Sequence, residues 1–487
     1  MTQFDKRNIS MLMDLYELTM ANGYFSSQQE PQRVVFDVFY RKNPDQGGYA
    51  IFTGLEQVIE YVENLHFGNE DIAYFRSQNL FSEEFLAYLK DFQFSGDIYA
   101  FSEGTIMYPN EPIITVVAPL IDAQLIETAI LTQVNHQSLI ATKTSRIVRA
   151  AQGRLVSDFG ARRAHNMDAA VYGARAAYIG GVSSTATVMA SQEFGIPVNG
   201  TMAHSWVMYF KNEYEAFRRY AQVYPDNVVF LADTYDVLHS GIPNAIRVAK
   251  EVLHPMGNRL KGIRLDSGDL AYLSKKVRKM LDDAGLMDCK IVVSNSLDEY
   301  TITSILNQGG QIDSFGVGER LITAKSDPVF GAVYKIVAVE ESGKFIPRIK
   351  VSETVEKITN PGLKQVYRIY GDCGQAVADL ITGAEETVDL SCPYRYVDPE
   401  KPWKNRCFEN CTIRKLQKLI VKDGRRVYPA QSLDEIRTYV KKQLDTEIWP
   451  EEQRFENPHK HFLDMSPAYY KMKMNLLDET RNMSQEV

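Results

Sequence analysis

The sequence predicts an α/β protein: an irregular (β/α) barrel, preceded by an N-terminal α+β domain and followed by a C-terminal extension. The chain has 487 residues, of which 45% are hydrophobic and 24% charged, as in a globular protein with a large core. Short β-rich runs recur in its middle part at the spacing of βα units. Each run ends in polar, charged or Gly-rich residues, which is typical of parallel strands whose carboxyl ends carry function.

The first part of the chain alternates between helical and extended patterns. Apolar residues at helical spacing predict a helix that ends at Gly23, and "RVVFDVFYRK" predicts a strand. A helix in "GLEQVIEYVENL" and strands in "GDIYAFSEGTIMYPNEPIITVVAPL" follow. These elements form a predicted N-terminal domain over residues 1–122. A long helical pattern over 123–151 then begins the predicted barrel domain, 123–350.

The predicted barrel strands share one pattern, a short apolar run followed by a polar turn. They lie in the segments "GRLVSDFGARR", "AAYIGGVSST", "IPVNGTMAHSW", "NVVFLADTYD", "KGIRLDSGDL", "KIVVSNSLDE" and "IDSFGVGERL". An open doubly wound sheet would gather its chemistry at one switch point, whereas a barrel brings many strand ends around one mouth. Because so many of these ends are polar, the pattern favours a barrel.

The last part of the chain, residues 351–487, is predicted to pack on the N-terminal domain and the barrel. Segment 388–412 contains Pro and Cys and is expected to be irregular. The stretch "AQSLDEIRTYVKKQLDTE" predicts a surface helix, because a Ser stands at its start and an acidic residue follows soon after. Four cysteines lie in this part without the close CxxC spacing of a zinc site: Cys373, Cys392, Cys407 and Cys411.

Composition excludes several classes of function. The net charge of -8 argues against nucleic acid as the main partner, because phosphate backbones require clustered Lys and Arg. The N-terminus shows no apolar signal region, and no uncharged run is long enough to span a membrane. We therefore expect a cytoplasmic protein that does not bind a membrane. P-loop, Rossmann, HExxH and GxSxG motifs do not occur in the sequence.

The strand ends nevertheless carry chemical groups. Arg162, with a second Arg beside it, suits a carboxylate or phosphate, or belongs to solvated surface pairs. Asp266 suits ribose hydroxyls or Mg²⁺, or it caps a helix. Gly316 and Gly318 suit a phosphate cradle, or form a plain tight turn. Around one mouth, such groups would suit a phosphorylated sugar and a small anionic co-substrate.

One further strand end, "GTMAHSW", contains His204 among small and hydroxyl-bearing residues. A single histidine in such a place is either a core residue with satisfied hydrogen bonds or a catalytic group. The segment alone leaves both interpretations open.

Taken together, these segments resemble those of the nicotinate phosphoribosyltransferases, which belong to the type II phosphoribosyltransferases. The resemblance rests on "MDLYELTMANGYF", "GGYAIFTGLEQVIEYV", "FSEGTIMYPNEPIITV", "SDFGARRAH", "GTMAHSW", "IRLDSGDL", "FGVGERL" and "KITNPGLKQVYR", in this order. It implies that nicotinate displaces pyrophosphate from 5-phosphoribosyl 1-pyrophosphate to give nicotinate mononucleotide, in the salvage of NAD. It also implies coupling to ATP hydrolysis, a requirement for Mg²⁺, and a homodimer with sites near the subunit interface.

The resemblance also implies roles for individual residues. His204 matches the histidine that ATP phosphorylates, and Asp233 is placed to orient it. Arg264 matches a contact to nicotinate or to the phosphoribosyl group, and Asp266 suits the ribose. The other implied substrate contacts are Tyr16 and Phe159 on the two faces of the pyridine ring, Arg162 and Thr201 at nicotinate, and Gly316, Gly318 and Thr323 at the 5-phosphate.

Two positions depart from relatives. Many relatives have Thr directly after the Gly-x-Gly, where this chain has Glu319, so Thr323 is a candidate replacement at the phosphate. Relatives that prefer nicotinamide carry an acid near the position of Ser183. A neutral Ser183 favours nicotinate, because an acid there would repel the nicotinate carboxylate. The alternatives are a nicotinamide-using enzyme of the same fold and a catalytically silent, metabolite-binding homologue.

Overall fold

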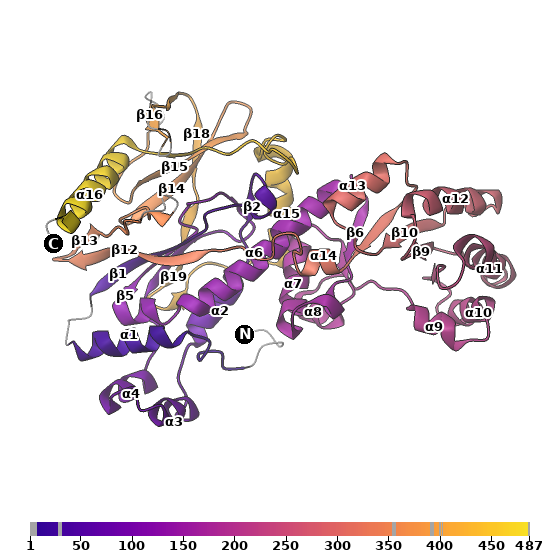
Figure 1. Cartoon of the computed structure of the whole chain (residues 1–487), viewed down its shortest axis with the longest axis horizontal. Coiled ribbons are helices and arrows are strands. Elements are labelled where there is room, and N and C mark those ends of the chain that lie inside the picture. Colours follow the sequence, from indigo (N-terminus) through magenta and orange to yellow (C-terminus); the bar gives the residue numbers. More distant parts are fainter. Residues whose placement is uncertain are drawn as a thin grey trace. The chain divides into compact units, whose positions relative to one another are not determined.

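The computed structural model describes residues 7–27, 32–352, 357–389, 394–398, 401 and 403–485. The chain forms two compact units: the first consists of Met1–Leu139 and Val329–Val487, and the second of Ile140–Pro328. Figure 1 shows both with their helices and strands labelled. The predicted division at 1–122, 123–350 and 351–487 stays a prediction.

A parallel sheet forms the centre of the second unit. Its strand order is β7-β6-β11-β10-β9-β8, and each neighbouring pair is parallel. The strands are β6 (Leu155–Asp158), β7 (Ser184–Thr185), β8 (Val229–Leu231), β9 (Gly262–Leu265), β10 (Lys290–Ser294) and β11 (Ser314–Val317). Fully buried apolar side chains on these strands, among them Phe230, Ile263, Ile291 and Phe315, make up its core.

Helices follow the strands of this sheet, as the spacing of the β-rich runs predicts. They are α7 (Met167–Ile179), α8 (Val188–Phe194), α9 (His204–Tyr209), α10 (Glu213–Val223), α11 (Ile242–Val248), α12 (Leu270–Asp283), α13 (Glu299–Asn307) and α14 (Glu319–Ile322). The mixed α/β fold is confirmed, with partly curled sheets. Among the described strands, β7 and β8 remain the two ends of the ladder, which makes the barrel irregular. One predicted strand, "IPVNG", contributes only a parallel bridge between Val198 and Thr185.

The first unit interleaves segments from both ends of the chain. Its seven-stranded sheet has the order β13-β12-β1-β5-β3-β19-β20, and Figure 1 shows β1, β5, β12 and β19 in one layer. The strands are β1 (Arg33–Phe39), β3 (Asp97–Phe101), β5 (Ile114–Pro119), β12 (Val333–Glu341), β13 (Lys344–Pro347), β19 (Gln417–Lys422) and β20 (Arg425–Arg426). A buried ion pair between Lys364 and Asp37 also joins late and early segments.

The remaining strands of the first unit form two further sheets. A six-stranded sheet has the order β17-β16-β21-β15-β14-β18, and β2 pairs with β4. These strands are β2 (Ala50–Ile51), β4 (Ile106–Met107), β14 (Lys364–Tyr370), β15 (Ala376–Gly383), β16 (Tyr394–Val397), β17 (Asn405–Phe408), β18 (Thr412–Lys415) and β21 (Leu463–Met465). The expectation of an irregular segment over 388–412 was therefore wrong where β16 and β17 form a hairpin. Cys392 lies outside the described residues.

The helices that begin in the first unit are α1 (Leu15–Ser26), α2 (Leu55–Asn64), α3 (Asn69–Ser77), α4 (Glu83–Lys90), α5 (Leu120–Gln124), α6 (Glu127–Ala150), α15 (Leu433–Lys442) and α16 (Pro467–Gln485). α1 continues past Gly23, because this glycine retains helical pairing and Ser27 donates its backbone N–H to the Gly23 carbonyl. The long helical pattern of 123–151 is divided between α5 and α6. The predicted surface helix is confirmed as α15, where Ser432 and Glu435 form a capping box.

Candidate active site

Arg264 stands at the centre of a cluster at the carboxyl ends of the parallel strands. It lies on β9, and its side chain is only 10% exposed. Its guanidinium donates three hydrogen bonds: Nε to the Ser294 hydroxyl (2.9 Å), one terminal nitrogen to Thr201 Oγ1 (3.0 Å) and the other to Asp266 Oδ1 (3.1 Å). Because one planar group binds Ser294 at the end of β10, Asp266 after β9 and Thr201 in the segment before α9, it fixes the relative positions of these three segments.

His204 and Asp233 form a second part of the cluster. His204 is the first residue of α9, and its Nε2 lies 3.2 Å from Asp233 Oδ1. The histidine side chain is 39% exposed, whereas that of Asp233 is 1% exposed. Asp233 Oδ2 accepts hydrogen bonds from the Asp266 backbone N–H (2.9 Å) and the Ser267 hydroxyl (2.6 Å). The buried carboxylate therefore orients an accessible imidazole, whose Nδ1 is left for another partner.

Phe159 connects this cluster to Gly316 on β11 and to Gly318, which follows that strand. The Arg264 guanidinium lies 5.4 Å from the centre of the Phe159 ring, within the range of a cation–π contact. A Cβ on Gly316 would lie 2.5 Å from the Phe159 ring, and one on Gly318 would lie 3.1 Å from the Phe159 carbonyl oxygen. Gly316 is therefore required for the position of the ring. The sequence assigned both glycines to phosphate, and the structure adds that they make room for Phe159.

Four other predicted site residues are not among the hydrogen-bond partners described above. Arg162 is exposed on a short 3₁₀ turn after β6. The Thr323 hydroxyl donates to the Glu319 carbonyl (2.8 Å), and the Ser183 hydroxyl donates to the Val156 carbonyl (3.0 Å). Tyr16 lies on α1 in the first unit and is 43% exposed. The predicted roles of these four residues stay predictions.

The charged side chains that follow the Gly-x-Gly turn form ion pairs. Glu319, at the start of α14, forms an ion pair with Lys325 (2.7 Å), and this hydrogen bond lowers the pKa of the Glu319 carboxyl group. Arg320 pairs with Asp298. Lys325 therefore already compensates the acid that replaces the expected Thr, so the turn does not carry an unpaired negative charge.

Two further hydrogen-bonding positions at strand ends were not singled out from the sequence. Ser294 ends β10 and accepts from Arg264, and its hydroxyl also donates to Asp266. Thr185 ends β7 and donates to the buried Asp158. Both stand at the end of a predicted strand, the same signal that indicated Asp266. Their hydrogen-bond partners could not be predicted from the sequence, because hydrogen bonds between strand ends depend on the order of the strands in the sheet.

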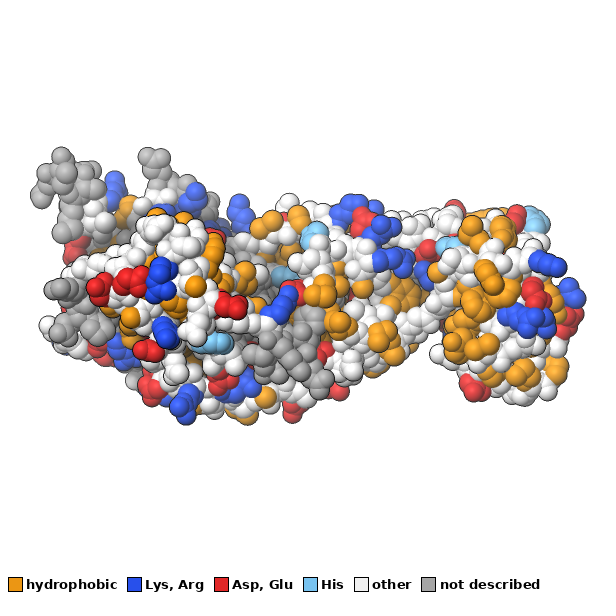
Figure 2. Space-filling view, turned by 90° about the horizontal axis from the view of Figure 1, so that it is seen from below, with side chains coloured by type: hydrophobic (Ala, Val, Ile, Leu, Met, Phe, Trp, Pro, Cys, Tyr) orange, Lys and Arg blue, Asp and Glu red, His pale blue; other side chains and the backbone are white. Residues whose placement is uncertain are grey.

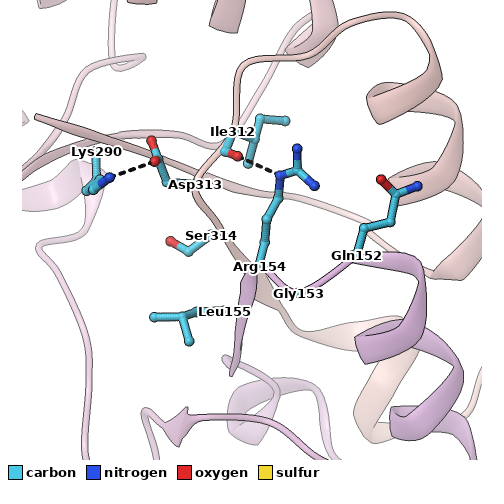
Figure 3. Close-up of a pocket in the computed structure, with 8 residues that line it drawn as sticks. All are labelled: Gln152, Gly153, Arg154, Leu155, Lys290, Ile312, Asp313 and Ser314. Atoms are coloured by element: carbon cyan, nitrogen blue, oxygen red, sulfur yellow. Dashed lines mark hydrogen bonds and ion pairs between the residues drawn. The ribbon is translucent and has the colours of Figure 1, made fainter. Parts of the chain in front are cut away.

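A pocket of the second unit lies at the opposite edge of the same sheet (Figure 3). Leu155, Lys290 and Ser314, the first residues of β6, β10 and β11, line it together with Gln152, Gly153, Arg154, Ile312 and Asp313. Lys290 forms an ion pair with Asp313 (3.0 Å), and Arg154 Nε donates to the Ile312 carbonyl (2.9 Å). These are the amino ends of the strands, so this pocket is separate from the cluster at the carboxyl ends.

Some large apolar side chains on helices and turns of the second unit are exposed, and hydrophobic side chains gather in Figure 2 over the end of this unit. Met208 is 65% and Tyr209 84% exposed on α9, and Tyr235 is 60% exposed after β8. No described helix is long and apolar enough to cross a membrane. In the described part of the chain, no group of three or more His, Cys, Asp or Glu side chains is arranged to hold a metal ion.

Comparisons with known proteins show the family of this chain. Three family models match: the nicotinate phosphoribosyltransferase N-terminal domain over residues 11–135, the nicotinate phosphoribosyltransferase family over 155–367 and the corresponding C-terminal domain over 363–473. The chain is 44% identical over 486 residues to a nicotinate phosphoribosyltransferase of Bacillus subtilis, covering 99% of this chain and 98% of that protein. It is 30% identical to a human nicotinate phosphoribosyltransferase, with 94% of each chain covered.

Solved structures give the same result. The crystal structure of human nicotinic acid phosphoribosyltransferase matches with a TM-score of 0.85 and 27% identity, covering 96% of this chain and all of that one. A nicotinate-nucleotide pyrophosphorylase from Pyrococcus furiosus matches with a TM-score of 0.69 and 25% identity, covering 90% of this chain and 96% of that one. With matches over nearly its whole length in both sequence and fold, this chain belongs to the nicotinate phosphoribosyltransferase family of enzymes.

Proposed function

We propose that this enzyme couples the formation of nicotinate mononucleotide to the hydrolysis of ATP through a phosphohistidine at His204. Nicotinate and 5-phosphoribosyl 1-pyrophosphate are its other substrates, and pyrophosphate is its other product. Membership of the family supports the transfer reaction. The observation that supports the coupling is the contact between the accessible His204 imidazole and the buried Asp233 carboxylate.

The transfer step needs positioning more than proton transfer. The pyridine nitrogen attacks C1 of the ribose, and the bond from C1 to the pyrophosphate oxygen breaks with its electron pair leaving on pyrophosphate. Because the pyridine nitrogen is already a nucleophile, no general base is required. Phe159 would stack on one face of the ring and Tyr16 on the other, while Arg264 and Thr201 bind the nicotinate carboxylate. Such positioning lowers the entropic part of the activation barrier.

His204 would act in a separate step. Asp233 accepts a hydrogen bond from the Nε2–H, which keeps the proton on Nε2 and the lone pair on Nδ1, and this lone pair attacks the γ-phosphorus of ATP. A nitrogen–phosphorus bond forms, the bond to the β,γ-bridging oxygen breaks, and ADP leaves. Water later hydrolyses the phosphohistidine and releases phosphate. Asp233 thus orients the nucleophile and stabilises the positive charge that develops on the ring.

Asp266 and the Gly-x-Gly turn would bind the phosphoribosyl group. Asp266 Oδ1 accepts hydrogen bonds from Arg264 and Ser294, and the carboxylate could also accept a hydrogen bond from a ribose hydroxyl. Gly316 and Gly318 would bring backbone close to the 5-phosphate. Thr323 is the candidate side chain for the phosphate on the same turn, where Lys325 compensates the charge of Glu319. Arg162 would attract the anionic substrates from its exposed position.

The donor set also fits Mg²⁺. This ion usually keeps several waters and takes one or two carboxylates together with substrate phosphates, so a cluster of three protein ligands is not required. Asp266 and Asp269 stand at the end of β9 and are the acidic side chains closest in sequence to the proposed ribose site. Bound there, Mg²⁺ would neutralise charge on the departing pyrophosphate.

We further infer a cytoplasmic homodimer with sites near the interface. Met208, Tyr209 and Tyr235 support this inference, because they are large and exposed, and an interface with a second copy would remove their apolar surface from water. Tyr16, which is half exposed on α1, is the predicted ring-covering residue and belongs to the first unit.

Product analysis tests the proposed substrate and its coupling. Nicotinate or nicotinamide is supplied at equal concentration with 5-phosphoribosyl 1-pyrophosphate and Mg²⁺, with and without ATP. We expect nicotinate mononucleotide, little product from nicotinamide, and a faster and more complete reaction with ATP. Preference for nicotinamide would overturn the substrate assignment, and identical progress with and without ATP would overturn the coupling.

A further inference from the structure

Asp158 is a buried carboxylate to which the proposed mechanism gives no role. It ends β6, directly before Phe159, and its exposed fraction is 0%. Within the described residues, its carboxylate has two partners, and both are neutral: the Gly160 backbone N–H donates to Oδ1 (2.8 Å) and the Thr185 hydroxyl donates to Oδ2 (2.7 Å). Burial raises the pKa of Asp158. A carboxylate in such a place is costly, and both of its hydrogen bonds lead to candidate substrate-binding segments.

The bond to Gly160 fixes the turn that presents Phe159. The side chain of Asp158 spans this turn and accepts from the residue two positions later, as in an Asx-turn. A Cβ on Gly160 would lie 2.9 Å from Asp158 Oδ1 and 2.5 Å from the Ile322 side chain, so the turn is tightly packed. The Phe159 N–H also donates to the Val317 carbonyl (2.8 Å). These bonds determine where the ring lies relative to β11.

The bond to Thr185 leads to the opposite side of the proposed nicotinate site. Thr185 ends β7, and its backbone N–H donates to the Pro197 carbonyl (3.0 Å) while its carbonyl accepts from the Asn199 N–H (2.9 Å). Two residues after Asn199 comes Thr201, whose hydroxyl accepts from Arg264. The Thr185 hydroxyl in turn accepts from the Thr187 N–H (3.0 Å), so its own hydrogen is committed to Asp158.

We propose that Asp158 is a positioning residue that sets the spacing between Phe159 and the Thr201 segment, and hence the width of the nicotinate site. Its link across the sheet is the Thr185 hydroxyl. The inference rests on the proposed role of Phe159 at the pyridine ring. Asp158 itself is fully buried and acts through its neighbours, without contact to the substrate.

Asp158→Asn and Thr185→Val test the link. In Asp158→Asn, the side-chain amide has one acceptor oxygen and cannot accept both bonds, and Thr185→Val keeps the shape of the side chain without the hydroxyl. We expect each to raise the KM for nicotinate by about fivefold to tenfold, the range of one stacking contact. The KM for 5-phosphoribosyl 1-pyrophosphate and kcat should change by less than about twofold, because the stacking contact on the ring is lost equally in the ground state and the transition state. Thr185→Ser keeps the hydroxyl, so its KM for nicotinate should equal that of the wild type.

Asp122→Asn is the matched control. Asp122 is also a buried carboxylate with a raised pKa that accepts one backbone N–H and one hydroxyl, both from Ser95 at 2.8 Å. It belongs to α5 in the first unit. Its replacement should lower the thermal midpoint as Asp158→Asn does and leave the KM for nicotinate unchanged. Equal effects of both replacements on this KM would mean that Asp158 acts only through stability, and would overturn the inference.

Phe159→Leu separates this inference from the proposed function. If it raises the KM for nicotinate while Asp158→Asn and Thr185→Val do not, the positioning role is wrong and the stacking role stands. If Phe159→Leu leaves that KM unchanged, the assigned role of Phe159 is wrong, and the inference that rests on it falls with it. Support for both requires all three variants to weaken nicotinate binding.

Discussion

His204 Nε2 lies 3.2 Å from Asp233 Oδ1, and the second oxygen of the same carboxylate accepts from the Asp266 backbone and the Ser267 hydroxyl. One buried carboxylate therefore joins the proposed phosphate acceptor to the proposed ribose-binding loop. A change of charge on the imidazole is felt directly by the group that holds this loop. This gives a physical route by which phosphorylation of His204 would alter binding of the phosphoribosyl substrate.

The first prediction concerns the nitrogen that is phosphorylated. Because Nε2 faces Asp233, Nδ1 is the nitrogen available to ATP. We expect the phosphoenzyme to carry phosphate on Nδ1, as read from the ³¹P and ¹⁵N chemical shifts of enzyme labelled in its histidines. Phosphate on Nε2 would show that the His204–Asp233 contact is broken before phosphoryl transfer.

The second prediction concerns Asp233. In Asp233→Asn, an NH₂ group replaces one of the two carboxylate oxygens, and an NH₂ group cannot accept a hydrogen bond. Either His204 or the Asp266–Ser267 loop therefore loses its acceptor. We expect ATP hydrolysis to fall on the order of a hundredfold, the usual cost of removing one group that stabilises charge developing in the transition state. Asp236→Asn is the control, because Asp236 also pairs with a histidine, His239 at 3.1 Å, but on an exposed turn. A comparable loss in the control would contradict the assignment.

The third prediction concerns Arg264. Lys at this position cannot reproduce three hydrogen bonds from one planar group. We expect Arg264→Lys to raise the KM for nicotinate about tenfold or more and to lower the free energy of unfolding by roughly 1–3 kcal/mol. Arg278→Lys is its control: Arg278 also donates to three partners, Asp282 and the carbonyls of Leu286 and Cys289. It should lose stability with nicotinate binding unchanged.

The fourth prediction concerns the pH dependence of stability. Burial raises the pKa of Glu17 from 4.5 to about 7, against the hydrogen bonds from Thr128 and Asp14 that lower it. Between these two values the folded state keeps a proton that the unfolded state releases, so stability falls as the pH rises from about 4.5 to about 7. Glu17→Gln cannot ionise, and its free energy of unfolding should lack this fall, which amounts to about 3 kcal/mol at most.

Denaturant titrations of both proteins at several pH values measure this difference. Below about pH 4.5 the wild type and the Gln variant should differ little, and above about pH 7 the variant should be relatively more stable. An equal fall of stability in both proteins would show that another group titrates in this window.

The sequence predicted the elements that carry the site, and the reason is physical. Each parallel strand is an apolar run that ends in polar residues, so Asp233, Arg264 and Asp266 were identifiable at strand ends from the residues themselves, whereas Phe159 was identified only through the family resemblance. The contacts between these residues could not be predicted, because they depend on the strand order β6-β11-β10-β9-β8, which no local sequence pattern encodes.

Other misses have the same origin. Residues 394–397 and 405–408 form strands because they pair with each other, and the first of them also pairs with β21; the Pro and Cys residues of the surrounding segment had indicated irregular structure. Glycine at position 23 predicted a helix end, but nothing there requires a left-handed conformation, and the helix continues to Ser26. The pairing of β1 with β12 and of β3 with β19 was not predicted either, because it joins segments that lie far apart in the chain.

The role of His204 is the central claim, and ATP turnover measured together with product formation tests it most directly. In the wild type, we expect release of ADP and phosphate to accompany nicotinate mononucleotide, and ³²P from γ-labelled ATP to enter the protein. His204→Ala should abolish labelling and ATP hydrolysis and retain slow transfer without ATP, whereas His239→Ala should behave as the wild type. Undiminished ATP hydrolysis in His204→Ala would contradict the account.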